Sequence, residues 1–242
     1  MILAVDIGNT SISMALFNKH QILKREHCHS IDGFKKQLNT IQNYEISSVA
    51  ISSVVPSLTV QYSNLLKKNY NYSVTIIDHK LSQLSLKVKK PETIGVDRIC
   101  NIYATITDYD VPAIIIDFGT ATTYDVVNSK GEFIGGAIAT GIETSTKYLI
   151  DNAALLSNTE FKFPKNTIGV NTEENIQSGI MYGALEQVKG MIQRINFETN
   201  KNHNLILTGG LANLISTKLS QPHIVDIDLT LKGIIYIYES NL

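Results

Sequence analysis

Two short stretches of the chain end an apolar run in a carboxylate and a glycine turn. "MILAVDIGNT" runs into Asp6 and Gly8, and "AIIIDFGTAT" runs into Asp117 and Gly119. A buried strand seldom ends in an unpaired carboxylate, because a buried charge has to be paired or neutralised. The repeated pattern therefore marks both aspartates as candidates for chemistry.

Each of these turns has two explanations. In a plain hairpin, the aspartate caps its own turn and the glycine supplies a positive φ. In a phosphate clamp, the glycine lets the backbone approach a phosphate, while turn N–H groups and the hydroxyls of Thr10 and Thr120 donate hydrogen bonds to it. Asp6 and Asp117 would then hold a neutralising cation, directly or through water. Because two copies open two similar halves, we favour a metal–nucleotide site over two plain hairpins; the P-loop pattern is absent.

Two further stretches could complete such a site. "TIGVDRICN" places Gly95, Asp97 and Arg98 at the start of a predicted helix. Asp97 is either a capping carboxylate or a base that accepts a hydroxyl proton during phosphoryl transfer, and Arg98 is either a surface cation or the partner of an anionic substrate group. "LILTGG" is either a strand-to-helix connection or a flat backbone surface for an adenine or ribose.

The hydrophobic periodicity predicts the elements that position these residues. Strands are expected on both sides of each Asp-Gly turn and at 47–55, 73–78 and 205–208. Helical faces are predicted by Phe34, Leu38 and Ile41, by Leu58, Tyr62, Leu65 and Leu66, by Ile99, Ile102 and Ile106, and by a helix of about 20 residues from Ile176 to Ile195. The segment at 231–238 fits a closing helix, although "IIYIY" also fits a strand. Strands mixed with helices in two similar halves predict an α/β protein of two lobes, 1–110 and 111–242, with a ligand cleft between them.

The composition excludes several other classes of protein. The 242 residues carry a formal net charge of −1, which gives no electrostatic reason to expect a nucleic-acid partner. Two distant cysteines, Cys28 and Cys100, make a disulfide framework improbable. The N-terminus lacks the features of a signal peptide, and no apolar run reaches the roughly 18 residues of a spanning helix. We therefore expect a cytoplasmic protein without membrane segments.

Taken together, the motifs resemble those of type III pantothenate kinases, in the superfamily of acetate and sugar kinases, heat-shock chaperones and actin. The matching pieces span nearly the whole chain, and their order and spacing are more specific than any one of them. They are Asp6-Ile-Gly-Asn-Thr10, Ser53-Val-Val-Pro56, Gly95-Val-Asp-Arg98, Asp117-Phe-Gly-Thr-Ala-Thr122, Gly135-Gly136 with Gly141, Ile168-Gly-Val-Asn-Thr172 and Thr208-Gly-Gly210.

The resemblance implies two ribonuclease-H-like lobes, a homodimer, and ATP-dependent phosphorylation of pantothenate, the first step towards coenzyme A. It implies Mg²⁺ with the ATP and a monovalent cation, K⁺ or NH₄⁺, at Asp117. Asp97 would be the proton acceptor, and Thr172 would reach pantothenate from the neighbouring subunit. The other pantothenate contacts would be Gly95, Val96, Asp97 and Arg98. By the family pattern, the ATP phosphates are bound by Thr120 and by Asp6, Ile7, Gly8, Asn9, Thr10, Ser11, Ile12 and Ser13.

Two positions depart from the family pattern, and other functions compete with the kinase. Val88 stands where family members often carry a tyrosine that contacts pantothenate, and Thr140 stands where proline is common.

The competing hypotheses are a nucleotide-binding regulatory accessory protein without turnover, a filament protein with an actin-like core, and a related sugar or acyl kinase. Asp97 and Arg98 argue against a pure binder, and the chain has little room for actin's insertions.

Overall fold

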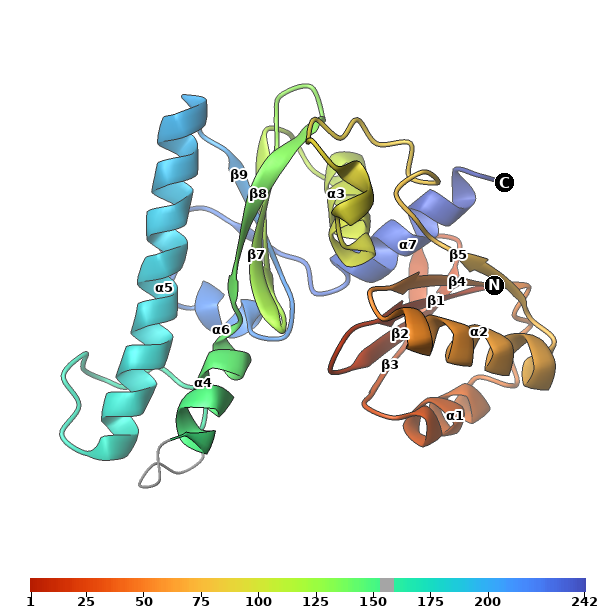
Figure 1. Ribbon diagram of the computed structural model, residues 1–242, viewed down its shortest axis with the longest axis horizontal. Helices are drawn as coiled ribbons and strands as arrows, with labels where there is room; N and C mark the ends of the chain where they lie inside the picture. Colours follow the sequence, from red (N-terminus) through yellow and green to blue (C-terminus); the bar gives the residue numbers. More distant parts are fainter. Residues whose placement is uncertain (153–158) are drawn as a thin grey trace. The chain divides into compact units, whose positions relative to one another are not determined.

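The computed structural model describes residues 1–152 and 159–242, which form two compact units (Figure 1). The first unit comprises Met1–Asp110, Gly131–Ile134 and Asp228–Leu242, and the second comprises Val111–Lys130 and Gly135–Ile227. Each unit contains a five-stranded mixed sheet with helices packed on it, which confirms the predicted α/β class.

The sheet of the first unit has the strand order β3-β2-β1-β4-β5. Strands β1 to β3 form an antiparallel meander, and β4 and β5 continue the sheet in parallel with β1. The strands are β1 (Ile2–Ile7), β2 (Ile12–Asn18), β3 (Gln21–Cys28), β4 (Ser48–Ser53) and β5 (Ser73–Ile76).

Alternate residues of β1 face two different pairs of helices, as the two-residue period of a strand requires. Leu3, Val5 and Ile7 pack in one cluster with side chains of α1 (Ile31–Thr40) and α2 (Pro56–Tyr70). Ala4 points to the other face, towards α3 (Val96–Asp108) and α7 (Leu229–Glu239). Asp6 shares the face of Ala4, so its carboxylate lies on the side of the sheet that α3 covers.

The segment predicted as either a closing helix or a strand is the helix α7, which packs against α3 and β1 (Figure 1). It carries Leu231, Ile234 and Ile235 into the same cluster as Ile99 and Cys100 of α3. The segment forms a helix because its apolar face is buried on the surface of the sheet. It cannot pair with β1 as a strand, because β1 already has a strand neighbour on each side.

The sheet of the second unit has the strand order β10-β9-β6-β7-β8. Strand β6 pairs antiparallel with β7 and parallel with β9. The strands are β6 (Ala113–Phe118), β7 (Ala121–Val127), β8 (Phe133–Thr140), β9 (Asn204–Thr208) and β10 (Ile224–Val225), and the helices are α4 (Ile142–Asp151), α5 (Thr172–Thr199) and α6 (Ala212–Ser216).

Helix α5 runs along this sheet and supplies much of the unit's core (Figure 1). Ile114, Ile116 and Phe118 of β6 pack with Met181 and Leu185 of α5. The helix has 28 residues, longer than predicted, because it begins at a cap before the apolar periodicity and ends after it, where Asn200 adopts a left-handed conformation. Asp117 lies on the opposite face of β6 from the α5 contact, as residue alternation along the strand dictates.

Among the described residues, no helix combines the length and the apolar character needed to cross a membrane.

Candidate active site

The turn between β1 and β2 presents its polar groups outward. The Gly8 N–H donates to the Ser11 carbonyl at 3.0 Å, which closes the turn, and Asn9 and Thr10 are exposed. Gly8 does not adopt a positive φ, and neither does Gly119 in the second turn. The explanation that these glycines supply a positive φ is therefore wrong. Their role is instead to leave out a Cβ in a tight turn, since a Cβ on Gly8 would lie 3.3 Å from the Ser11 carbonyl oxygen.

Two histidines flank this turn. His29 Nδ1 lies 3.0 Å from the Thr10 carbonyl oxygen, and His27 Nδ1 lies 3.1 Å from Ser13 Oγ. Their rings meet edge to face with centroids 4.9 Å apart. Partial burial and the proximity of His29 lower the pKa of His27, so its ring is neutral at pH 7. Both rings contact the candidate phosphate loop, His29 at the Thr10 carbonyl and His27 at the Ser13 hydroxyl.

Asp6 is half-buried at the end of β1 and is held from the neighbouring strand. The Ser52 hydroxyl donates to Asp6 Oδ1 at 2.9 Å. Asp6 and Ser52 are opposite each other in the parallel register of β1 and β4. The Asp6 carboxylate is thus hydrogen-bonded, and it lies at the strand end next to the exposed turn.

Asp97 lies in the first turn of α3, directly after a single 3₁₀ turn at Pro91–Thr93. The N-cap position belongs to Gly95, which makes no side-chain cap, and Asp97 Oδ1 instead accepts the Arg98 N–H at 2.8 Å. Burial raises the pKa of the Asp97 carboxyl, and the backbone N–H groups and the Arg98 charge oppose this only in part. A Cβ on Gly95 would collide with Asp97 Oδ1, so glycine leaves room for the carboxylate. This environment suits a proton acceptor better than a cap.

Arg98 is half-buried and contacts an aromatic ring. Its guanidinium carbon lies 5.8 Å from the centroid of the Phe133 ring, a cation–π distance. Phe133 is itself tied to the segment before α3, because the Lys87 N–H donates to its carbonyl at 2.8 Å and its own N–H donates to Ser85. The aromatic ring restricts the arginine to a limited set of orientations.

In the second unit, Asp117 sits between two glycines. A Cβ on Gly119 would lie 3.6 Å from Asp117 Oδ1, and a Cβ on Gly209 would lie 2.5 Å from the same atom. Gly209 also adopts φ +88°, which side-chain-bearing residues rarely do. Thr208 lies opposite Asp117 in the register of β9 and β6, so the Thr-Gly-Gly turn borders the carboxylate.

Thr120 follows in the β6–β7 turn, and the start of α4 buttresses it. The Thr120 carbonyl accepts the Gly141 N–H at 3.1 Å and the Thr144 hydroxyl at 2.8 Å. These two hydrogen bonds fix the backbone of the β6–β7 turn.

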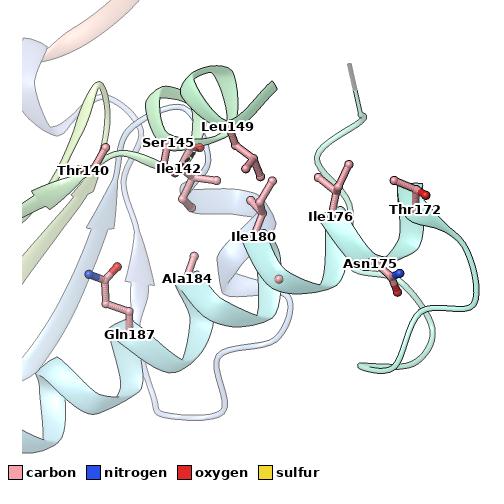
Figure 2. Close-up of a pocket in the computed structure, with 11 residues that line it drawn as sticks. Thr140, Ile142, Ser145, Leu149, Thr172, Asn175, Ile176, Ile180, Ala184 and Gln187 are labelled. Atoms are coloured by element: carbon pink, nitrogen blue, oxygen red, sulfur yellow. Dashed lines mark hydrogen bonds between the residues drawn. The ribbon is translucent and has the colours of Figure 1, made fainter. Parts of the chain in front are cut away.

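Thr172 is the first residue of α5 and is placed by a reciprocal cap. The Asn171 side chain accepts the Glu174 N–H at 2.9 Å, and the Glu174 carboxylate reaches back to the Val170 N–H at 3.1 Å. Thr172 lines a groove of about 550 Å³ between α4 and α5. Figure 2 shows Ile142 and Leu149 of α4 pointing towards Ile176 and Ile180 of α5 across it. Thr140, a departure from the family pattern, lines the same groove.

The predicted residues are divided between the two units. The first unit contains the Asp6–Ser13 turn and the Gly95–Arg98 helix start, and the second contains Asp117, Thr120 and Thr172. Sequence reasoning missed Ser52 and Phe133, whose contacts arise from strand register and a long-range bridge.

A family model and the curated relatives of the chain agree on one family. The model of the family "Type III pantothenate kinase" matches residues 2–194. Type III pantothenate kinases from Halalkalibacterium halodurans and Thermomicrobium roseum are 36% and 38% identical to the chain; the match covers 100% of both sequences for the first, and 99% of this chain and 97% of the relative for the second.

Solved structures share the fold at lower identity. A putative Baf family transcriptional activator from Campylobacter jejuni has a TM-score of 0.65 at 19% identity, covering 99% of this chain and 98% of that one. The activator of the 2-hydroxyisocaproyl-CoA dehydratase from Clostridium difficile, solved with bound ADPNP, has a TM-score of 0.58 at 13% identity, covering 99% of this chain and 94% of that one. Such neighbours support the fold, and the family rests on the curated relatives.

Proposed function

The chain belongs to the type III pantothenate kinase family, and on that premise we propose that it transfers the γ-phosphoryl group of ATP to the primary hydroxyl of pantothenate. The product would be 4′-phosphopantothenate, and the reaction would be the first step of coenzyme A biosynthesis. The observation that carries the proposal is the Asp97 carboxylate, half-buried in the first turn of α3, with its pKa raised and its Oδ1 accepting the Arg98 N–H.

Asp97 would act as the proton acceptor. The pantothenate hydroxyl gives its proton to the carboxylate as its oxygen bonds to the γ-phosphorus, and the bond from that phosphorus to the β–γ bridging oxygen breaks to release ADP. A base works best when its pKa lies near the working pH, so burial that raises the pKa of Asp97 makes it a stronger acceptor than an exposed aspartate. Gly95 and Val96, which precede this carboxylate at the start of α3, would contact pantothenate beside it.

Arg98 would bind the carboxylate of pantothenate. A guanidinium can pair with a carboxylate in a two-pronged geometry, and contact with the Phe133 ring orients it before the substrate arrives. Thr172 would contribute a further contact from a second subunit. In support of this homodimer, Ile168 and Val170, just before Thr172, are 84% and 86% exposed in the single chain, so two neighbouring apolar side chains are available to be covered by a second subunit.

The ATP phosphates would be bound by the loop from Asp6 to Ser13 and by Thr120. The exposed turn provides N–H and hydroxyl donors, and Asp6 is oriented to act on a phosphate-bound Mg²⁺. The surroundings of Asp117 fit a monovalent cation such as K⁺ or NH₄⁺, since glycines on two sides keep space beside Oδ1 that a Cβ would fill. When bound, such cations neutralise negative charge on the phosphates.

The cytoplasmic location stays a prediction.

Steady-state kinetics of the purified protein test the proposal. Rates of ADP formation should depend on pantothenate, and Asp97→Asn should lower kcat by about 10²–10⁴-fold, the usual contribution of a general base. Glu92→Gln is the matched control, since it neutralises an exposed carboxylate five residues earlier and should leave kcat unchanged. Pantothenate-dependent turnover that survives Asp97→Asn would contradict the role of Asp97. Nucleotide binding without turnover would favour an accessory protein.

A further inference from the structure

Ser52 is a buried hydroxyl for which the proposed mechanism has no use. Its side chain is fully buried on the face of the first sheet that α3 covers, on the same side of β4 as Ala50. Its hydroxyl donates to Asp6 Oδ1 at 2.9 Å. A serine that only filled space at this position would be replaced at little cost by alanine, whereas a donor to a carboxylate supplies a charge-assisted hydrogen bond.

Cys100 of α3 belongs to the buried cluster on this same face of the sheet. Burial, with the negative charges of Asp6 and Asp97 nearby, raises the pKa of the Cys100 thiol well above its ordinary value, so the thiol is protonated and adds no charge beside Asp6. Because an ionised carboxylate only accepts hydrogen bonds, the Ser52 hydroxyl is the donor in its contact with Asp6.

Helix α3, which carries Cys100, packs closely against α7. A Cβ on Gly233 of α7 would lie 2.5 Å from the Cys100 carbonyl carbon and 2.8 Å from its Cα, so the two helices pack backbone to backbone there. Asp97 stands one turn before Cys100 on α3. Asp6 and Asp97 thus belong to a strand and a helix that pack on each other, with Ser52 and Cys100 both fully buried on this face of the sheet.

From this geometry we propose that Ser52 is a positioning residue, which holds the Asp6 carboxylate in the orientation that Mg²⁺·ATP requires. The inference rests on the proposed function, because it assigns Asp6 to nucleotide binding. It adds a residue that acts through Asp6 and touches no substrate itself.

The test is a double-mutant cycle measured by isothermal titration with Mg²⁺·ATP, so that no turnover is needed. Ser52→Ala should weaken binding by about tenfold in the natural chain, the effect of losing a hydrogen bond to a charged group. In the Asp6→Asn background the same change should weaken binding less than twofold, because its target is gone. Thr105→Val is the matched control: it removes a buried hydroxyl of α3 that has no hydrogen-bond partner, and it should leave binding unchanged.

The outcomes separate a positioning role from a structural one. A merely structural Ser52 would produce the same loss in both backgrounds, or would raise the KM for pantothenate as much as the dissociation constant of Mg²⁺·ATP, and either result would overturn the inference. So would unchanged binding in Ser52→Ala. A natural chain that binds Mg²⁺·ATP but does not phosphorylate pantothenate would refute the proposed function alone, and the cycle would still decide the role of Ser52. Absence of nucleotide binding would overturn both.

Discussion

Replacing Gly209 by alanine should damage the Asp117 site, whereas the same change at Gly210 should not. At Gly209 the new Cβ would lie 2.5 Å from Asp117 Oδ1 and 2.6 Å from the Phe118 nitrogen. Ordinary contacts of a carbon atom are about 3.5 Å, so the carboxylate or the turn must move by about 1 Å. Gly210 is exposed, and a Cβ there meets nothing within 4 Å.

The expected magnitudes follow from this displacement. Holding a side-chain-bearing residue at φ +88° costs about 1–3 kcal/mol, and the overpacked Cβ costs about 1–3 kcal/mol more. Even the lower sum, about 2 kcal/mol, corresponds to a fall of about 4–8 °C in Tm for a chain of this size. Misplacing a catalytic-site group by about 1 Å can lower the rate about 10²-fold.

Two assays on Gly209→Ala and Gly210→Ala check these values. Thermal unfolding followed by circular dichroism should separate the two variants in Tm. Titration of pantothenate-dependent activity with KCl should give Gly209→Ala a higher potassium concentration for half-maximal activation, as well as a lower maximal rate. Equal Tm values and equal potassium curves for the two variants would refute the assignment of Asp117 and its glycine neighbours.

Four further predictions concern Asp97, Arg98 and Val170. Burial raises the pKa of Asp97 in the folded chain, so the ionised carboxylate destabilises the fold as pH rises through that pKa. Asp97→Asn should therefore raise the urea midpoint of unfolding at pH 7 relative to the natural chain. In acid, where the carboxyl is protonated in both states, the two urea midpoints should become equal. For the same reason, kcat/KM for pantothenate should fall on the acid side at a pH above the ordinary aspartate pKa of about 3.9, and a limb at or below that value would contradict a raised pKa. Arg98→Lys should raise the KM for pantothenate about tenfold with little change in kcat, because lysine cannot pair in two-pronged geometry, and an unchanged KM would remove Arg98 from the substrate site. Val170→Asp should shift the sedimentation coefficient from dimer to monomer, and a natural chain that sediments as a monomer would refute the dimer.

The parts of the site that the sequence could predict are those with local signals. An apolar run that ends in Asp-x-Gly identified the ends of β1 and β6, and the glycine before Val-Asp-Arg identified the start of α3. The start of α5 also had a local signal, because Asn171 followed by Glu174 is a capping pattern that places the first turn before the apolar face begins.

The remaining parts depend on contacts between distant segments. Ser52 reaches Asp6 because β1 and β4 pair in one particular parallel register, and a shift of one residue would turn the hydroxyl to the other face. Phe133 reaches Arg98 because the chain returns from the second unit to the first at residues 131–134. Composition and periodicity contain no information about either pairing, so a single sequence could not place these two residues.

The central claim is that this chain phosphorylates pantothenate, and direct observation of the product tests it. The purified protein, incubated with Mg²⁺, K⁺, ATP and pantothenate, should produce a new phosphomonoester signal in ³¹P NMR together with ADP, in amounts equal to the ATP consumed. We expect no such signal without pantothenate. ATP that stays intact with pantothenate present, or that transfers its phosphate only to a sugar or an acyl acceptor offered in its place, would contradict the claim.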